Sequence, residues 1–427
     1  MNFREVFLQK GIIMKIVYIT QHFPPEIGAA QGRAYDMSKN LSELGHDIHV
    51  LTTFHNSRPI KKMFKKEKKD HLTIYRSFRI RDTKSSSIRR LANYLSFMIS
   101  SCIAGLFIKK PDVIYATSPQ LFQGVTGYFL SRVHRTKFVF EIRDLWVDFA
   151  ELLGQFQNKK LLNLARKLEA FLYKRADHLI VVTHGYKQRL INQGIPEEKI
   201  TVIPNGVNPS SLTIEEHSQT ESIREKYDIQ DKFIVLYAGN IGAAQGLQTI
   251  VTAANLLKDD QSIMFLLIGE GVEKNRLMEQ AKALNLTNLL FIDSKKKHEL
   301  NQFYEACDIG IVSLKKHPLF EITIPSKLFD YMSMSTPVLI GVDGEAREIV
   351  ENHQAGFYFE PENPEDFVRV LKMAQNQPNQ LIKIRQNVKD ELLQAFNREE
   401  QAKKLSETLT ILTKEAAKKI HNKTTSS

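Results

Sequence analysis

Short apolar runs alternate with amphipathic segments along most of the chain, which is the pattern of strands that alternate with helices. Five apolar runs of the first half predict buried strands, at 15–20, 48–53, 112–116, 137–142 and 178–183, and KITVIPNGVN predicts a further strand that ends at Pro204. Three segments around them have helical spacing, at 33–44, 159–175 and 185–192. Because the connections are short, we expect parallel βαβ units of an α/β fold.

The second half repeats this scheme after a polar stretch at 209–219. Its predicted strands lie at 233–239, 264–268, 288–293 and 308–314, and one more follows the helix of PSKLFDYMS. The expected domains are an N-terminal one at 14–207 and a C-terminal one at 208–395. The extension at 1–13 lacks the apolar core of a signal peptide and is expected to be unstructured. The last segment, 396–427, contains a helix expected to cross back onto the first domain; the rest of the C-terminal domain is expected to be helical.

Each half opens with a strand that runs into a glycine-bearing turn, HFPPEIGAA in the first and AGNIGAAQG in the second. Such turns lie at the carboxyl ends of parallel strands, where backbone N–H groups and a helix N-terminus attract phosphate. Gly239, Gly242 and Gly246 do not have the spacing of a dinucleotide fingerprint, so a dinucleotide cofactor is not the first expectation. Two nucleotide-fold domains with a ligand cleft between them are expected.

The formal net charge of +11 over 427 residues favours an anionic partner or simply solubility. No arginine-rich segment interleaved with aromatic residues is present, so nucleic acid is not expected to bind. The sequence has no CxxC or HExxH motif, and no metal site is predicted. Cys102 and Cys307 lie among apolar residues and are expected to be small buried side chains.

Two segments of the first half bear on a membrane. The uncharged segment 91–108 would form a helix about 27 Å long, marginal for a bilayer core of about 30 Å. Leu91, Leu95, Met98, Cys102 and Leu106 form one apolar stripe, with Asn93, Ser96 and Ser100 opposite. An amphipathic helix of a soluble domain is therefore favoured over a membrane span. The segment IKKMFKKEKKD at 60–70 is either a solvated basic loop or a contact with anionic lipid headgroups.

Four stretches, HFPPEIGAA, VIPNGV, LIGEG with NLLFID, and IPSKLFDYMSMSTPVLIG, occur in an order that resembles the retaining glycosyltransferases of family 4, which have the GT-B fold. EIRDLW and PSKLFDYMS are most similar to the O-antigen and capsule subgroup, including N-acetylfucosamine transferases of the WbuB type. The resemblance implies transfer from a nucleotide sugar, such as a UDP-N-acetyl sugar, to a polyprenyl-diphosphate-linked saccharide. It also implies a monomer or weak oligomer on the cytoplasmic face of the membrane, with no metal or other cofactor.

The resemblance places the donor in the C-terminal domain. The family's arginine and lysine for the donor diphosphate fall on Asn240 and Gln245, which are uncharged, so Lys327 at the start of the PSKLFDYM helix is the expected replacement. Of the family's two acids, the second falls on Asp330, a candidate for the ribose hydroxyls, and the first falls on Ile322 beside Glu321. The expected donor-binding residues are Gly239, Asn240, Gly242, Gln245, Gly269, Glu270, Gly271, Glu321, Ser326, Lys327 and Asp330.

The acceptor is expected in the N-terminal domain. The family's reaction-centre histidine falls on Thr117, which leaves other polar residues as candidates to hold the acceptor or the reacting sugar. Arg143 suits a diphosphate because its guanidinium matches phosphate oxygens. The expected acceptor residues are His22, Gly28, Ala29, Thr117, Glu141 and Arg143, and the expected catalytic residues are Lys327, Asp144 and Arg143.

Two other functions remain open from the sequence. Nucleotide-sugar 2-epimerases share the fold and would turn over a UDP-sugar without any acceptor. A non-catalytic sugar- or lipid-binding scaffold would explain why Asn240, Gln245, Thr117 and Ile322 occupy catalytic-type positions.

Overall fold

The computed structural model describes residues 12–26, 29–55, 63–81, 87–154, 158–207, 222–388 and 393–424. The chain divides into two compact units. The N-terminal unit comprises Met1–Pro204 together with Arg398–Ser427, and the C-terminal unit comprises Asn205–Asn397. The expected extension at 1–13 lies outside the described residues, except for Ile12 and Ile13.

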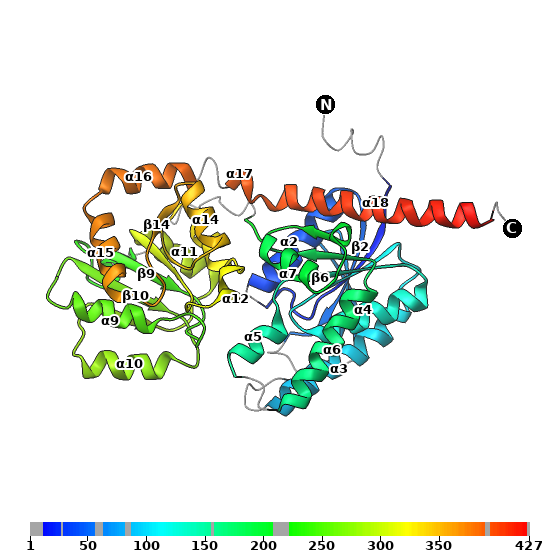
Figure 1. Ribbon diagram of the computed structural model, residues 1–427, viewed down its shortest axis with the longest axis horizontal. Helices are drawn as coiled ribbons and strands as arrows, with labels where there is room; N and C mark the ends of the chain where they lie inside the picture. Colours follow the sequence, from blue (N-terminus) through cyan, green and yellow to red (C-terminus); the bar gives the residue numbers. More distant parts are fainter. Residues whose placement is uncertain are drawn as a thin grey trace. The chain divides into compact units, whose positions relative to one another are not determined.

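The N-terminal unit is built on an eight-stranded sheet (Figure 1). Its strands, in spatial order, are β3 (Phe64–Lys69), β4 (Leu72–Ser77), β2 (Asp47–Thr53), β1 (Lys15–Ile19), β5 (Val113–Thr117), β6 (Lys137–Ile142), β7 (His178–Val181) and β8 (Ile200–Val202). All neighbouring pairs are parallel except β3 with β4. The central strands are fully buried, as expected when helices cover both faces of a parallel sheet.

The lysine-rich run forms the edge strand β3 in its described part, so the expectation of a loop was wrong there. Residues 60–62 of that run lie outside the described residues. Charged side chains on an exposed edge prevent other strands from pairing with it. Protection of the sheet edge therefore explains the lysines of β3 without any contact to lipid.

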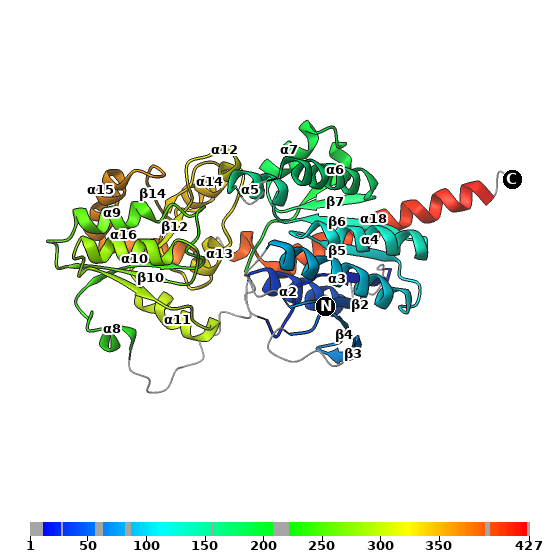
Figure 2. The same ribbon diagram turned by 90° about the horizontal axis from the view of Figure 1, so that it is seen from below.

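Helices cover the two faces of this sheet in separate layers (Figures 1 and 2). The helices of the unit are α2 (Ala29–Glu43), α3 (Ser87–Leu106), α4 (Leu121–His134), α5 (Trp146–Leu152), α6 (Lys159–Arg175), α7 (His184–Asn192), the short 3-10 helix η1 (Glu197–Lys199) and α18 (Arg398–Thr424). One face carries α2 and α18, which pack on each other, and the opposite face carries α3, α4 and α6.

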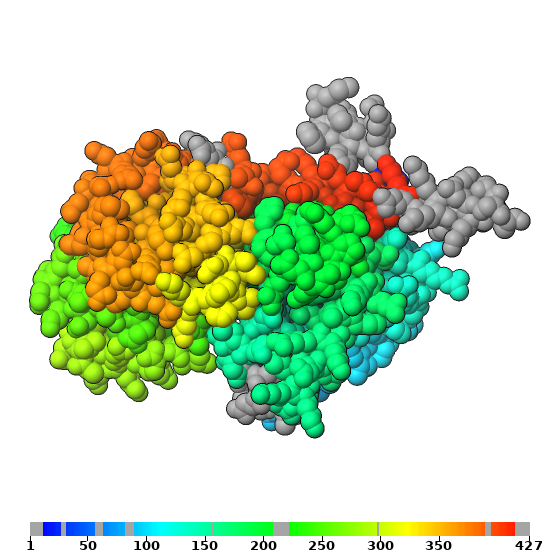
Figure 3. Space-filling view, in the orientation of Figure 1, coloured from blue at the N-terminus to red at the C-terminus, as the bar shows by residue number. Residues whose placement is uncertain are grey.

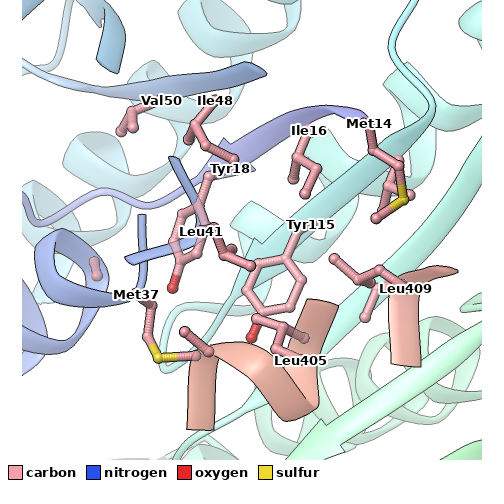
Figure 4. Close-up of a cluster of buried hydrophobic side chains, with 14 of the residues drawn as sticks. Met14, Ile16, Tyr18, Met37, Leu41, Ile48, Val50, Tyr115, Leu405 and Leu409 are labelled. Carbon is pink, nitrogen blue, oxygen red and sulfur yellow. The ribbon is translucent and has the colours of Figure 1, made fainter. Parts of the chain in front are cut away.

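The last helix of the chain completes the core of the N-terminal unit. Leu405 and Leu409 of α18 are fully buried in a cluster with Tyr18 of β1, Tyr115 of β5 and Met37 of α2 (Figure 4). The side chain of Arg398 also forms an ion pair with Asp36 in α2. The segment that follows the C-terminal unit therefore belongs structurally to the N-terminal one.

The helix α3 turns a mixed side inward: Phe97 and Ala104 are buried together with polar residues, whereas Leu91 and Leu106 of the expected apolar stripe are exposed. Asn93 and Ser100 are 2% exposed, and Ser101 is fully buried. The Asn93 Oδ1 accepts a hydrogen bond from Gln21 Nε2 at 2.6 Å, and Ser100 Oγ donates to the carbonyl oxygen of Phe78 at 2.5 Å. Hydrogen bonds to neighbouring loops and the burial of Phe97 therefore hold α3 on the unit together.

The C-terminal unit contains a six-stranded, entirely parallel sheet. Its strands, in spatial order, are β11 (Leu289–Ile292), β10 (Ile263–Ile268), β9 (Phe233–Ala238), β12 (Ile309–Ser313), β13 (Val338–Gly341) and β14 (Gly356–Tyr358). Its helices are α8 (Ile223–Lys226), α9 (Gln248–Leu256), α10 (Lys274–Ala283), α11 (Lys297–Ala306), α12 (Pro318–Glu321), α13 (Ser326–Ser333), α14 (Glu345–Asn352), α15 (Pro364–Gln375), α16 (Pro378–Asn387) and α17 (Leu393–Ala395). The strand β14 was missed, because the sequence after β13 was predicted to be helical throughout.

Candidate functional site

The strand order of the C-terminal unit marks where a ligand binds. Strands β9 and β12 are neighbours, and the connections that follow them lead to opposite sides of the sheet, to β10 and to β13. In open parallel sheets, ligands bind beyond the carboxyl ends of the strands at such a switch point. Gly239 follows β9 directly and Leu314 follows β12.

The turn after β9 is held in place over the end of β12. The backbone N–H of Gly242 donates to Gln245 Oε1 at 3.2 Å, so this side chain stabilises the turn. Ser313 Oγ at the end of β12 donates to the Gln245 carbonyl oxygen at 2.8 Å, and the Lys315 N–H donates to the Ala244 carbonyl oxygen at 2.9 Å. The two strand ends are therefore tied together by hydrogen bonds at the switch point.

Lys327 lies against this turn. Its Nζ donates to Tyr237 Oη at 2.8 Å and lies 4.2 Å from the centroid of the Tyr237 ring. The Tyr237 hydroxyl in turn donates to the carbonyl oxygen of Asn240 at 2.6 Å. A Cβ atom added to Gly239 would lie 3.4 Å from Lys327 Cε, so the turn and the lysine are in contact. Desolvation by the surrounding protein lowers the pKa of Lys327 to about 7, against the opposing effect of Asp330.

The helix α13 presents its N-terminus at the same place. Its N-cap is Pro325, and no side chain of the described residues caps the helix. The Tyr331 hydroxyl fixes the helix to β9, since it donates to the Leu236 carbonyl oxygen at 2.8 Å and accepts from the Ala238 N–H at 3.2 Å. Lys327 in the first turn is unfavourable next to the positive end of the helix dipole unless an anion binds there. The N-terminus and the ammonium group together favour an anionic ligand.

The turn after β10 supports the turn after β9. A Cβ atom on Gly269 would lie 1.8 Å from the Gly239 carbonyl oxygen, and one on Gly271 would lie 2.1 Å from the carbonyl oxygen of Ile241. These glycines are therefore explained by close backbone packing. The carboxylate of Glu270 forms an ion pair with Lys274 Nζ at 2.9 Å, which anchors the same turn to α10.

The remaining donor candidates are accessible. Ser326 is exposed at the first position of α13, and Asp330 is exposed one turn later on the same helix. Glu321 is exposed at the end of α12. Asn240 is exposed as well, in the turn after β9.

The N-terminal unit has an equivalent switch point between β1 and β5. His22 follows β1, and its Nε2 lies 3.0 Å from the Nε2 of Gln120, which follows β5. On its other side, His22 Nδ1 lies 3.4 Å from a carboxylate oxygen of Glu26, which is also paired with the buried Arg79. These side chains form a polar cluster where the sheet topology predicts a ligand.

Glu141 does not belong to this polar cluster, although it was expected to hold the acceptor. Its side chain is fully buried on β6. One carboxylate oxygen accepts from Arg33 Nε at 3.0 Å and Nη2 at 2.8 Å, and the other accepts from Thr117 Oγ1 at 2.6 Å. Thr117 is 1% exposed, so both residues are committed to the fold. Arg33 also donates to the carbonyl oxygens of Ile203 and Pro204.

Arg143 and Asp144 follow β6, next to the switch point. The backbone N–H of Arg143 donates to Ser118 Oγ at 2.7 Å, which ties the ends of β5 and β6 together. Arg143 is half-buried and Asp144 is exposed. Gly28 lies outside the described residues, and Ala29 is the first residue of α2.

Sequence reasoning missed Tyr237, Gln120 and Arg33. Tyr237 lies in an apolar strand, where an aromatic residue is ordinarily read as core. Gln120 follows a strand, as His22 does, and that position was its only signal. Arg33 is a charged residue within a predicted amphipathic helix, and nothing in the helical spacing marks it as fully buried.

The residue ranges that the structure describes bear on metal binding and on membranes. No group of three or more histidine, cysteine, aspartate or glutamate side chains within those ranges has the arrangement of a metal site. No helix in the described part of the chain combines the length and the apolar character needed to cross a bilayer.

Two family models match the two halves of the chain. The model for Glycosyltransferase Family 4 matches residues 30–211, and the model for Glycosyl transferases group 1 matches residues 219–391. A putative colanic acid biosynthesis glycosyl transferase of Escherichia coli, WcaI, is 24% identical over 84% of this chain and 92% of its own.

Solved structures share the architecture. Sucrose-phosphate synthase from Thermosynechococcus elongatus matches with a TM-score of 0.73 at 16% identity, over 92% of this chain and 98% of its own. HepE of Anabaena, solved in complex with UDP-glucose, matches with a TM-score of 0.70 at 18% identity, over 93% and 99% of the two chains. The predicted fold class is confirmed, and the chain is a glycosyltransferase of group 1 and family 4 with the GT-B fold of two Rossmann-like domains.

Proposed function

We propose that this enzyme transfers a sugar, with retention of anomeric configuration, from a UDP-sugar to a polyprenyl-diphosphate-linked saccharide. The donor is a UDP-N-acetyl sugar such as UDP-N-acetylfucosamine, and the product is an O-antigen, capsule or exopolysaccharide precursor at the cytoplasmic membrane face. The relatives agree with this class, since WcaI is named for colanic acid biosynthesis and HepE was solved with UDP-glucose.

One observation carries the donor assignment: the ammonium group of Lys327 and the uncapped N-terminus of α13 face the turn after β9. The departing UDP gains negative charge as its bond to the sugar breaks, and donors positioned for that charge stabilise the transition state. Tyr237 holds one hydrogen of the Lys327 ammonium, which leaves two for phosphate oxygens. This arrangement offsets part of the diphosphate charge without a divalent ion.

The acceptor binds at the switch point of the N-terminal unit. Arg143 holds the acceptor diphosphate, and Asp144 and His22 orient the sugar that reacts. The acceptor hydroxyl attacks the anomeric carbon from the face that the diphosphate leaves. A new carbon–oxygen bond forms as the bond to the diphosphate breaks, and the hydroxyl proton passes to the departing phosphate oxygen.

Calorimetric titration with UDP tests the donor site. Lys327→Ala should weaken UDP binding by more than about tenfold, because losing a charge-assisted hydrogen bond costs about 1.5–3 kcal/mol. Lys282→Ala, at an exposed lysine of α10, is the matched control and should bind UDP like the wild type. If kcat/KM of Lys327→Ala stays within about threefold of the wild type, Lys327 does not stabilise the diphosphate. Loss of transfer in EDTA would contradict the metal-free part of the proposal.

The two alternatives are tested with the same protein. A 2-epimerase would convert UDP-N-acetylglucosamine in the absence of any lipid acceptor, whereas the proposed enzyme needs membranes that carry lipid-linked saccharide. A non-catalytic scaffold would fail to transfer any sugar from a panel of UDP- and GDP-sugars. A mass increase of the lipid product by one sugar would exclude both alternatives.

A further inference from the structure

The outward side of α3 is apolar. Leu91, Ile99, Ile103 and Leu106 are 43%, 56%, 36% and 45% exposed, and Phe107 just beyond the helix is 78% exposed. The side of the same helix that faces the unit buries Phe97 and Ala104 together with Asn93 and Ser100. A helix that also leaves several large apolar side chains exposed on its outer side is suited to an apolar partner.

The neighbouring helices continue this surface. Helix α3 packs against α4 so closely that a Cβ atom on Gly105 would lie 2.3 Å from the Leu130 side chain. The rings of Tyr128 in α4 and Phe171 in α6 are 5.1 Å apart, edge to face. The outer helical surface is defined by Leu91, Ile99, Ile103, Leu106 and Phe107, by Phe129 and Val133 of α4, and by Leu161, Leu164 and Phe171 of α6. The space-filling view shows the teal residues of α4 and α6 at the molecular surface (Figure 3).

The charge of these three helices is strongly positive. Helices α3 and α4 contain no acidic residue, and the one acid of α6, Glu169, is buried. The helices carry nine lysines and arginines in total, two in α3, one in α4 and six in α6. The guanidinium groups of Arg132 and Arg175 lie over the rings of Tyr128 and Phe171, at 5.2 and 5.6 Å from their centroids. Basic groups are thus mixed with the exposed apolar ones.

We propose that the outer helical surface docks the N-terminal unit on an anionic lipid bilayer. Exposed apolar side chains enter the headgroup region, and the lysines and arginines meet lipid phosphates. The charge argues against a second copy of the chain, because two such surfaces would bring like charges together. The inference rests on the proposed function, because docking on the bilayer would bring the lipid-linked acceptor to the N-terminal unit, which is expected to bind that acceptor.

Flotation with vesicles tests the docking without any sugar. The protein should float with vesicles of phosphatidylcholine and phosphatidylglycerol in a two-to-one ratio, and much less with phosphatidylcholine alone or at high salt. Ile99→Asn/Ile103→Asn/Phe107→Ser should lower the bound fraction about tenfold or more. Met278→Asn/Met373→Asn/Ile382→Asn removes exposed apolar groups of the C-terminal unit and should bind like the wild type.

A charge variant gives a second measurement. Lys160→Glu/Lys167→Glu should reduce binding about tenfold or more at low salt, because each cation near the surface contributes about 1 kcal/mol. Lys282→Glu/Lys383→Glu, at exposed lysines of the C-terminal unit, is the control.

Two results would overturn the inference. In the first, both variants of the outer helical surface bind vesicles as well as the wild type does. In the second, neither the wild type nor the apolar variant binds vesicles, and the wild type is a dimer that the apolar substitutions dissociate. Circular dichroism and thermal unfolding of each variant report whether the N-terminal unit is folded. If the wild-type protein binds vesicles but does not bind UDP, the proposed function is contradicted and the docking surface is not.

Discussion

Arg33 in α2 and Glu141 in β6 form an ion pair in which the two side chains are 1% and 0% exposed. Arg33 also donates to the carbonyl oxygens of Ile203 and Pro204, so one guanidinium group joins a helix, a central strand and the last residues before the C-terminal unit. The charge of Arg33 holds the pKa of Glu141 below its usual value, against the raising effect of burial. The pair therefore stays ionised inside the unit.

Removing one partner should destabilise the N-terminal unit severely. Arg33→Met leaves a buried carboxylate without its cation, and the free energy of unfolding should fall by about 3–5 kcal/mol in urea titration. Arg132→Met, at an exposed arginine of α4, should change it by less than about 0.5 kcal/mol. The double variant Arg33→Met/Glu141→Met should be more stable than Arg33→Met. Equal stability of these two variants would show that the uncompensated charge is not the cause.

The affinity for a UDP-sugar should depend on pH through Lys327. The free protein loses the Lys327 proton above its pKa of about 7, whereas the diphosphate favours the charged form. Affinity for UDP-glucose should therefore fall about tenfold per pH unit above pH 7, until the pKa of the complex is reached. Calorimetry in buffers of different ionisation enthalpy should show proton uptake on binding. Lys327→Arg should remove this pH dependence. If the affinity of that variant for UDP-glucose still falls with pH at the same rate, another group causes the dependence.

Gly269 should not tolerate a side chain. Its φ of +148° and the 1.8 Å approach of an added Cβ atom to the Gly239 carbonyl oxygen combine backbone strain with a backbone clash. Gly269→Ala should destabilise the C-terminal unit by about 3 kcal/mol or more and abolish UDP binding. Gly194→Ala is the control, because its φ is +84° but nothing lies within 4 Å. It should cost about 1–2 kcal/mol. If Gly269→Ala and Gly194→Ala lower the unfolding temperature equally, the effect at Gly269 comes from backbone conformation alone and not from the clash.

Asp144 should affect turnover and not donor binding. Asp144→Asn keeps the shape of the side chain and removes its charge, so kcat should fall about 100-fold while UDP affinity in calorimetry is unchanged. Asp47→Asn, at a carboxylate that is 51% exposed on β2, should leave both quantities unchanged. A kcat within about threefold of the wild type would remove Asp144 from the reaction.

The strand and helix pattern predicted most of the fold, because apolar runs of parallel sheets are conspicuous in the sequence. It failed where tertiary contacts decide. Helix α3 buries Phe97 beside Asn93 and Ser100, and periodicity cannot tell which side of such a helix faces the protein. Hydrogen bonds from Gln21 and to Phe78 contribute to this orientation, and both residues lie in other segments. The strand β3 was hidden by its lysines, which suit an exposed edge.

Motifs in the C-terminal unit led to Lys327 and Gly239 as donor-site candidates, and the structure brings these two residues into contact. Their roles in donor binding stay predictions. Glu141 was misassigned because a carboxylate at a strand end resembles a ligand group. Its partner Arg33 is 108 positions away in the sequence, and no local pattern connects the two.

The packing of Leu405 and Leu409 beside Tyr115 has a consequence for biosynthesis. The N-terminal unit is translated first, yet part of its interior is supplied by residues that follow the entire C-terminal unit. The apolar side chains that Leu405 and Leu409 cover must therefore wait, uncovered, while the C-terminal unit is made. A nascent chain halted before residue 398 should need chaperones to stay in solution.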